Sequence, residues 1–201
     1  MAEWVLASGN QGKLRELNQL FGSVGYHLRP QSEWQIEAAA ETGLTFVENA
    51  LLKARHASEL CQLPALADDS GLVVRALGGQ PGIHSARYAG EPSDAARNNS
   101  RLLAELQGKT DRRAYFYCAM VLLRQPLDPA PLIACGSWSG RILEQTRGTG
   151  GFGYDPLFLV PELGKTAAEL DDQVKNQLSH RGLASRGLMA QIQGLNLPPN
   201  P

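Results

Sequence analysis

Two adjacent carboxylates, Asp68 and Asp69, are the first residues whose type and spacing point to chemistry. They lie between short apolar runs within 63–74, and Ser70 and Gly71 follow them directly. Carboxylate oxygens are the ligands that hard cations prefer in proteins. Because neighbouring residues of a strand point to opposite faces, we expect one carboxylate to meet the ligand and the other to support a turn at the strand end. The plainer alternative is an ordinary Asx turn closed by Ser-Gly.

A second polar cluster is Ser8-Gly9-Asn10-Gln11-Gly12-Lys13, which follows the apolar run 4–7 and precedes an amphipathic helical pattern over 14–21. A strand, a glycine-rich turn and a helix start can cradle a phosphate, because free N–H groups and the helix dipole favour an anion. Lys13 adds a positive charge. The spacing is not that of a Walker loop, since Leu14 stands where Ser or Thr would follow the lysine. A plain strand-to-helix turn remains the alternative.

A third cluster lies on a predicted helix. Thr45 and Glu48 match a capping box, which predicts that a helix begins at Thr45. Asn49 and Lys53 follow at a spacing of four, on one stripe of that helix. The stripe either faces solvent or faces the acidic pair. We interpret His56, on the same stripe, as a solvated residue.

A glycine-rich segment, 148–153, matches the pattern GxGxxG. A dinucleotide fingerprint must open a helix, and the following Tyr154-Asp155-Pro156 does not. We therefore reject a Rossmann site. The aromatic residues Phe152 and Tyr154 instead favour a mobile wall on which a flat ring stacks.

The composition excludes several classes of protein. A formal net charge of −1 over 201 residues argues against a chain built to grip nucleic acid. No apolar run approaches the roughly 20 residues of a membrane span, and the start lacks the basic region of a signal peptide. An odd number of cysteines without a CxxC spacing predicts reduced thiols in a cytoplasmic protein.

The hydrophobic pattern predicts one compact α/β unit without repeats, ending in a frayed tail at 198–201. Predicted strands cover 4–7, 26–30, 113–123, 132–143 and 157–160. Predicted helices cover 14–21, a segment from Thr45 to about 57, a segment from Ser93 to about 106, a turn at 166–170, and 182–192.

Five motifs occur in order along the whole chain. They are Ser8-Gly9-Asn10-x-x-Lys13, Glu41-Thr42-Gly43-x-Thr45-Phe46-x-Glu48-Asn49-Ala50, Asp68-Asp69-Ser70-Gly71, Gly150-Gly151-Phe152-Gly153-Tyr154-Asp155-Pro156 and Ser179-His180-Arg181-Gly182. Together they closely resemble the inosine triphosphate pyrophosphatase family, whose members hydrolyse dITP, ITP and XTP. The acidic residues that some members carry just before Glu41 are alanines here, which can alter the metal shell slightly.

The resemblance implies an elongated α/β fold, in which helices flank a mixed twisted sheet and two lobes enclose a central cleft. It implies a single pyrophosphatase domain over residues 1–201, a homodimer and a Mg²⁺ cofactor. It also implies roles for individual residues. The triphosphate would be held by Ser8, Gly9, Asn10, Gln11, Gly12 and Lys13, with Lys53 nearby. The metal would be bound by Glu41 and Asp69 beside Asp68, and Asp69 would also activate the water. The substrate would be contacted by Ser70, Phe152, Gly153, Tyr154, Asp155, Lys175, His180 and Arg181.

The chemistry expected of these residues is direct hydrolysis. Water attacks the α-phosphorus in line with pyrophosphate, a carboxylate takes the proton, and Lys13, Lys53 and the metal offset the charge of the leaving group. The products are a nucleoside monophosphate and pyrophosphate. The family resemblance implies that this reaction removes deaminated purine nucleotides before a polymerase uses them. We further expect the donors of His180 and Arg181 to favour a 6-oxo over a 6-amino purine, the alternative being a polar helix cap.

Two rival functions remain open at this point. A phosphotransferase would need a Walker loop or an acceptor site, and neither is visible in the sequence. A non-enzymatic purine nucleotide-binding or nucleic-acid-binding module is disfavoured by the carboxylate pair, since carboxylates repel phosphates unless a metal intervenes.

Overall fold

The structure is a computed structural model that describes residues 2–195. It divides into two compact units. The first unit holds the described residues up to Asp69, Cys118–Gly136 and those from Arg181 onward, and the second holds Ser70–Tyr117 and Ser137–His180. The tail predicted at 198–201 lies outside the described residues. Among residues 2–195, no helix is both long and apolar enough to cross a membrane.

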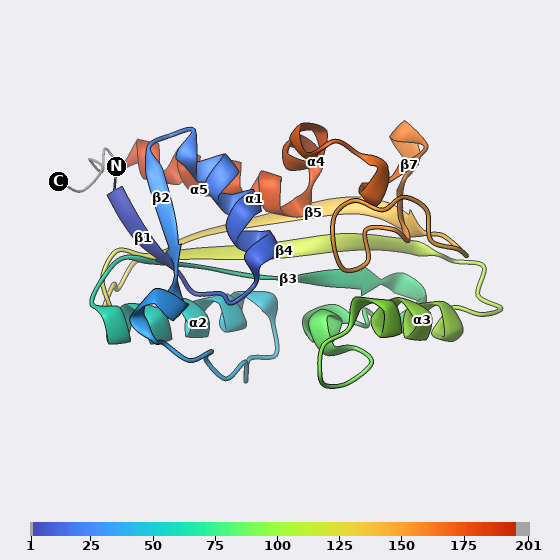
Figure 1. The fold of residues 1–201 in the computed structure, drawn as a ribbon, viewed down its shortest axis with the longest axis horizontal. Coiled ribbons are helices and arrows are strands. Elements are labelled where there is room, and N and C mark those ends of the chain that lie inside the picture. Colours follow the sequence, from blue (N-terminus) through green and yellow to red (C-terminus); the bar gives the residue numbers. More distant parts are fainter. Residues whose placement is uncertain (1, 196–201) are drawn as a thin grey trace. The chain divides into compact units, whose positions relative to one another are not determined.

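The strands form a mixed sheet in the order β2-β1-β3-β4-β5-β6-β7 (Figure 1). β1 pairs in parallel with β2 and β3, whereas β6 pairs antiparallel with β5 and β7. This arrangement confirms the predicted mixed α/β class. The strands are Ala2–Leu6 (β1), Tyr26–Pro30 (β2), Ala65–Val74 (β3), Arg113–Leu123 (β4), Leu132–Ile142 (β5), Phe158–Val160 (β6) and Lys165–Thr166 (β7).

Helices cover both faces of the strands. In the first unit, α1 and α5 lie on one face and α2 on the other (Figure 1). α2 presents Ala50, Ala54 and Ala57, all fully buried, so its backbone can approach the sheet closely. The helices are Gln11–Gly22 (α1), Phe46–Cys61 (α2), Ala95–Glu105 (α3), Asp172–Leu178 (α4) and His180–Gly194 (α5).

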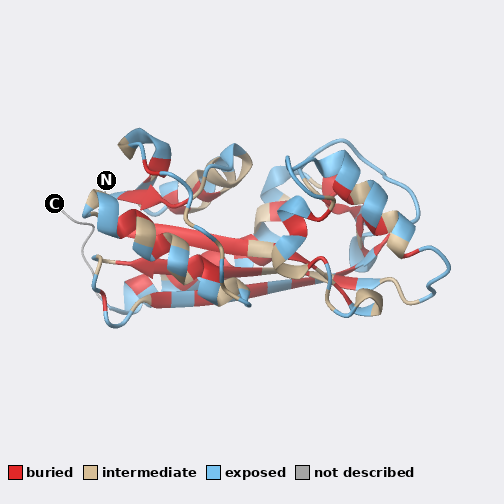
Figure 2. Cartoon of the chain, turned by 90° about the horizontal axis from the view of Figure 1, so that it is seen from below, coloured by how far each residue is buried: buried red, intermediate tan, exposed pale blue. Residues whose placement is uncertain are grey.

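Each unit has its own hydrophobic core. In the first unit, Leu17 and Phe21 of α1 pack with residues of β1, β4 and α5. In the second, a cluster of aromatic rings joins Phe116, Trp138 and Phe158, with ring centroids of Phe116 and Phe158 4.5 Å apart. Figure 2 shows buried residues running along the strands and exposed residues on the outer faces of the helices.

Several predicted elements are confirmed at residue level. The strands 26–30 and 113–123 have the predicted bounds. Thr45 caps α2 with both hydrogen bonds of the capping box in place. Other boundaries moved: α1 begins at Gln11 because Asn10 caps it, and α5 begins at His180. The seven-residue helix α4 was not predicted, because so short a segment shows little hydrophobic periodicity.

The prediction of a turn at the acidic pair is wrong. Asp68, Asp69, Ser70 and Gly71 lie within a single ten-residue strand, β3, which is buried along most of its length. Asp-Ser-Gly favours a turn locally, but the apolar residues on both sides place this segment in the interior of the sheet. There the strand finds other partners: the backbone N–H of Leu72, for example, donates to Ser85 Oγ at 2.9 Å.

Candidate active site

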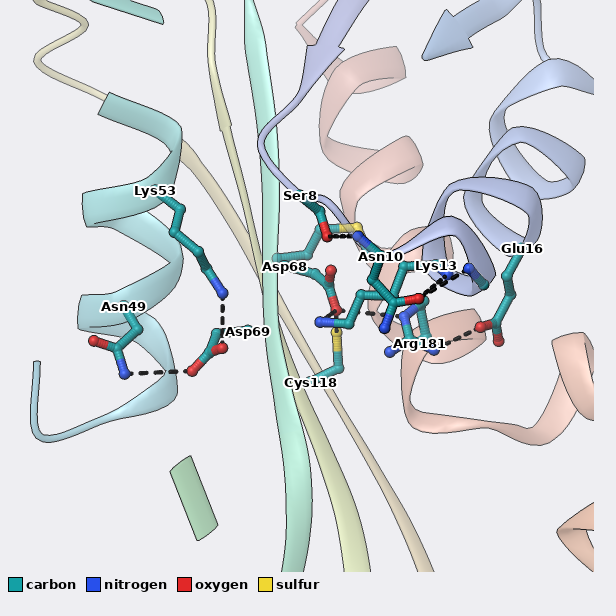
Figure 3. A network of polar contacts seen from close by, with 12 residues as sticks. Ser8, Asn10, Lys13, Glu16, Asn49, Lys53, Asp68, Asp69, Cys118 and Arg181 are labelled. Carbon is teal, nitrogen blue, oxygen red and sulfur yellow. Dashed lines mark hydrogen bonds and ion pairs between the residues drawn. The ribbon is translucent and has the colours of Figure 1, made fainter. Parts of the chain in front are cut away.

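The acidic pair of β3 points to opposite faces of the strand, as the alternation of strand side chains predicts. Figure 3 shows Asp68 on the side of α1 and α5 and Asp69 on the side of α2. Each carboxylate has its own lysine. Lys13 Nζ lies 3.0 Å from Asp68 Oδ2, and Lys53 Nζ lies 2.8 Å from Asp69 Oδ1. The two carboxylates therefore belong to two distinct charge clusters within the first unit.

The first of these two charge clusters consists of Lys53, Glu41 and Asp69, and the ammonium of Lys53 joins the two carboxylates. It contacts Glu41 Oε1 at 2.9 Å as well as Asp69 Oδ1 at 2.8 Å. Burial acts to lower the pKa of Lys53, but Asp69, Asp68 and Glu41 outweigh it and raise that pKa. Lys53 is therefore a permanent cation at neutral pH.

The environment of Asp69 differs from that of an exposed aspartate. Burial raises the pKa of Asp69 above its ordinary value, while the charge of Lys53 acts in the opposite direction. Its second oxygen, Oδ2, accepts a long hydrogen bond of 3.5 Å from Asn49 Nδ2. A buried carboxylate with a raised pKa is a better proton acceptor than an exposed one, which suits a general base.

The donor set of the first cluster fits a hard divalent cation. Glu41 Oε1 and Asp69 Oδ1 both contact the Lys53 ammonium, so two carboxylate oxygens surround the position of one positive charge. Within residues 2–195, no group of three or more His, Cys, Asp or Glu side chains is arranged to hold a metal. The two carboxylates of Glu41 and Asp69 therefore suit an ion that binds one or two carboxylates and completes its coordination shell with water and phosphate oxygens, as Mg²⁺ does.

In the second cluster, Asp68 lies between two cations. Its Oδ2 contacts Lys13 Nζ at 3.0 Å and Arg181 Nε at 3.3 Å, and the carboxylate is fully buried. Burial opposes ionisation of this group, but Lys13 and Arg181 outweigh it and hold the pKa of Asp68 well below its usual range. Asp68 is therefore a buried counter-ion of Lys13 and Arg181. The proposed role of Asp68 as a metal ligand stays a prediction.

Arg181 completes the second cluster. It is only 2% exposed, and its Nη1 lies 2.5 Å from Glu16 Oε2 while its Nε faces Asp68. Two carboxylates thus hold the guanidinium, an arrangement that sequence reasoning did not include. Glu16 and Arg181 are 165 positions apart, and the only signal was that Glu16 lies one helical turn after Lys13. The predicted contact of Arg181 with the substrate base stays a prediction.

The predicted phosphate loop forms the start of α1. Asn10 Oδ1 accepts hydrogen bonds from the backbone N–H groups of Gly12 and Lys13 at 2.9 and 3.1 Å. The N–H of Asn10 in turn donates to Ser8 Oγ at 3.2 Å. Gly9, Asn10 and Gln11 are exposed, whereas Ser8, Gly12 and Lys13 are half-buried. The N–H groups of Asn10, Gly12 and Lys13 are therefore bonded to side chains of the same loop.

The glycine-rich segment of the second unit is held by a buried ion pair. Lys175 Nζ lies 2.7 Å from Asp155 Oδ2, and the same oxygen accepts the backbone N–H of Phe152 at 2.8 Å. Lys175 also lies over the ring of Phe152, 5.0 Å from its centroid. At Gly151 a Cβ would meet Asp155 Oδ2 at 2.1 Å, so only glycine fits there. Asp155 and Lys175 thus shape this loop.

The two aromatic residues of that loop have different environments. Phe152 is 39% exposed, whereas Tyr154 is buried in the core and donates its hydroxyl to the backbone oxygen of Ser85 at 2.8 Å. A stacking role therefore stays a prediction for Phe152, and Tyr154 supports the loop from below. The oxygen of Gly153 accepts from Asn99 Nδ2 at 3.0 Å.

Two further predicted residues lie in the second unit. His180 is buried and its ring stacks on Phe116, with centroids 4.8 Å apart. Ser70 follows Asp69 in β3 and is half-buried. The five motifs are therefore distributed over both units.

Comparisons with known proteins match nearly the whole chain. A profile of the Ham1 family matches residues 4–191. The chain is 58% identical over 191 residues to a dITP/XTP pyrophosphatase of Aromatoleum aromaticum, with 95% of this chain and 96% of the relative covered. It is 58% identical over 193 residues to a protein of the same name from Halorhodospira halophila, with coverages of 95% and 96%.

A solved structure agrees with these matches. A HAM1 protein from Coxiella burnetii is 47% identical, with a TM-score of 0.89 and coverages of 96% of this chain and 100% of that one. The resemblance drawn from the five ordered motifs is thereby confirmed. With a family profile and relatives above 50% identity both spanning the sequence, the chain belongs to the Ham1 family.

Proposed function

We propose that this chain is a hydrolase of non-standard purine nucleoside triphosphates, converting dITP, XTP and ITP to the monophosphate and pyrophosphate. The observation that carries the proposal is the meeting of Glu41 and Asp69 at one cation position, with Lys53 at 2.9 and 2.8 Å from their oxygens. A second support is that the relatives with 58% identity are named dITP/XTP pyrophosphatases. Such an enzyme keeps deaminated purines out of nucleic acid synthesis.

In this proposal, Asp69 is the general base. Its carboxylate takes a proton from the water that attacks the α-phosphorus, and its raised pKa suits that step. Lys53 exchanges its contacts with the two carboxylates for contacts with phosphate oxygens. Lys13, anchored by Asp68, offsets the charge of the triphosphate and of the departing pyrophosphate.

The proposed cofactor is Mg²⁺, held by Glu41 and Asp69. Two carboxylates together with water and phosphate oxygens make the shell that Mg²⁺ prefers. When bound, the ion supplies positive charge that polarises the phosphate oxygens. Asp68 was predicted in the same set, but its contacts with Lys13 and Arg181 favour the role of an anchor.

The remaining assignments come from the family. Residues 8–13 are proposed to hold the triphosphate, and Ser70, Phe152–Asp155, Lys175, His180 and Arg181 to contact the nucleotide. The chain is proposed to act as one domain, as a homodimer and in the cytoplasm, with no nucleic acid or membrane as partner. One face of β5, on which alternate residues including Ile133 are exposed, offers a surface for a second copy.

A product assay tests the proposal. The protein is incubated with Mg²⁺ and either ITP, XTP or ATP, and released phosphate species are separated. We expect pyrophosphate and the monophosphate, with ATP cleaved more slowly by about 10²-fold or more, because a site built for a 6-oxo group leaves buried donors unpaired against adenine. Release of orthophosphate would point to a different bond, and tight binding without turnover would favour a non-enzymatic nucleotide-binding protein.

A further inference from the structure

Asn49 is a buried polar residue that the five-motif assignment leaves without a role. It lies in the first turn of α2 and is 1% exposed. A buried side-chain amide is costly unless both its ends find partners. Asn49 finds them on two different segments of the first unit: Oδ1 accepts the backbone N–H of Gly43 at 2.8 Å, and Nδ2 donates to Asp69 Oδ2 at 3.5 Å.

Those two segments carry the proposed metal pair. Gly43 lies two residues after Glu41, so the short hydrogen bond from its N–H fixes the loop on which Glu41 is mounted. Asp69 is the other carboxylate of the pair. One amide therefore connects the backbone next to Glu41 with the carboxylate of Asp69, as Figure 3 shows for the Asp69 side.

Lys53 makes the same kind of connection one helical turn later. Its ammonium contacts Glu41 Oε1 and Asp69 Oδ1. The two oxygens of Asp69 thus have different partners, with Oδ1 on a cation and Oδ2 on a neutral amide. A divalent cation can replace the Lys53 ammonium at Asp69 Oδ1, because Lys53 is proposed to move to the phosphate oxygens of the substrate. The neutral amide of Asn49 has no charge to exchange and keeps its contacts.

The glycine at position 43 is required for this bridge. A Cβ there would lie 2.6 Å from Glu48 Cβ and 2.8 Å from Asn49 Oδ1. Both distances are shorter than real Cβ contacts, so any side chain at position 43 must push the loop away from α2. The short contact between Gly43 N and Asn49 Oδ1 depends on that close approach.

From these contacts we propose that Asn49 is a positioning residue that holds Glu41 and Asp69 at the separation a divalent cation needs. It fixes the loop of Glu41 through Gly43 and directs Asp69 Oδ1, rather than Oδ2, toward the cation. The inference deepens the proposed function and rests on its metal pair. Residues that orient metal ligands in this way typically contribute about 10–100-fold to metal affinity.

The test measures metal binding without nucleotide. Mn²⁺ is titrated into the purified full chain, and free Mn²⁺ is followed by electron paramagnetic resonance. Asn49→Ala and Gly43→Ala should each weaken Mn²⁺ binding by about tenfold or more, because both break the same bridge from opposite ends. Thr45→Ala is the matched control. It removes the side-chain cap of the same helix and so lowers stability, but it leaves both contacts of Asn49, so its Mn²⁺ affinity should stay within about twofold of the wild type.

The outcomes separate clearly. Only variants that retain the wild-type circular dichroism spectrum are compared, and Gly43→Ala keeps the test valid if Asn49→Ala does not fold. Wild-type Mn²⁺ affinity in either folded variant overturns the proposal, as does equal weakening in Thr45→Ala. If the wild type itself binds no Mn²⁺, the metal pair is wrong and the proposal falls with it. The titrations contain no nucleotide, so they give the same result if the chain hydrolyses a different nucleotide from the one proposed. The positioning role of Asn49 and the proposed substrate can therefore be rejected independently.

As a second readout, kcat should depend on metal concentration in a way that a merely structural defect would not produce. In Asn49→Ala the metal concentration for half-maximal turnover should rise about tenfold, and saturating metal should restore much of kcat. A loss of kcat that no metal concentration relieves contradicts a positioning role.

Discussion

Asp69 combines two properties that a general base needs: a buried carboxylate with a raised pKa, and an oxygen directed at a cation position. The substitution Asp69→Asn preserves shape but removes the proton acceptor. We expect it to keep the fold and lower kcat by about 10²-fold or more. Steady-state kinetics with ITP at saturating Mg²⁺ measures the effect, and near-normal kcat would remove the assignment.

Asp111→Asn is a suitable control for that substitution, because Asp111 forms only an exposed pair with Arg113 and should not affect turnover.

Asp68 should behave differently from its neighbour, because it is fully buried between Lys13 and Arg181. Removing one member of a buried charge cluster leaves the others uncompensated, which costs about 3–5 kcal/mol. Asp68→Asn should therefore lower the free energy of unfolding by about this amount. Denaturant titration of Asp68→Asn and Asp69→Asn side by side checks the prediction, and equal stability of the two variants would contradict it.

The pH dependence of stability follows from the same residue. The pKa of Asp68 is depressed in the folded chain, so its contribution is present above the ordinary aspartate pKa and is lost as pH falls toward the folded value. In Asp68→Asn this acid-dependent part of the stability should be missing.

At the scale of elements, the local chemistry of helix starts was predictable and the long-range pairing was not. Thr45 and Glu48 lie three residues apart and fix the start of α2 without help from the rest of the chain. Asp68-Asp69-Ser70-Gly71 has equally strong local preferences for a turn, yet it forms the middle of β3 because tertiary burial outweighs those preferences. The contact between Glu16 and Arg181 could not be predicted from local preferences, because the two residues are 165 positions apart.

The start of α1 gives a prediction at this scale. Lys13 lies at the positive end of the helix, and Asp68 holds its ammonium at 3.0 Å. If this end binds the triphosphate, Lys13→Ala should both raise KM and lower kcat for ITP, because the lysine would neutralise substrate and leaving group alike. Lys109→Ala, which removes an exposed lysine of the second unit, is the control.

The kinetic comparison is direct. Unchanged KM and kcat in Lys13→Ala would show that residues 8–13 are only a strand-to-helix turn. A rise in KM for Lys109→Ala of the same size would show that the effect reports overall charge and not a phosphate site.

At the scale of the whole chain, the ordered motifs predicted the family and the structure explains which of their residues act together. In the first unit, motif residues take part in two charge clusters, one on each face of β3, and Lys53 and Glu16 join them from outside the motifs. In the second unit, Asp155 of the glycine-rich motif pairs with Lys175, which lies outside the motifs, and accepts the backbone N–H of Phe152. Sequence spacing left open whether Lys53 faces solvent or the acidic pair, and the fold shows that it joins Glu41 to Asp69.

The most direct test of the central claim is the position of the attacked phosphorus. ITP is hydrolysed by the chain in ¹⁸O-labelled water with Mg²⁺, and both products are analysed by mass spectrometry. Attack of water on the α-phosphorus places one ¹⁸O in inosine monophosphate and none in pyrophosphate, and this is the result that the account predicts. Label in pyrophosphate, or in orthophosphate released from the γ-position, would contradict it.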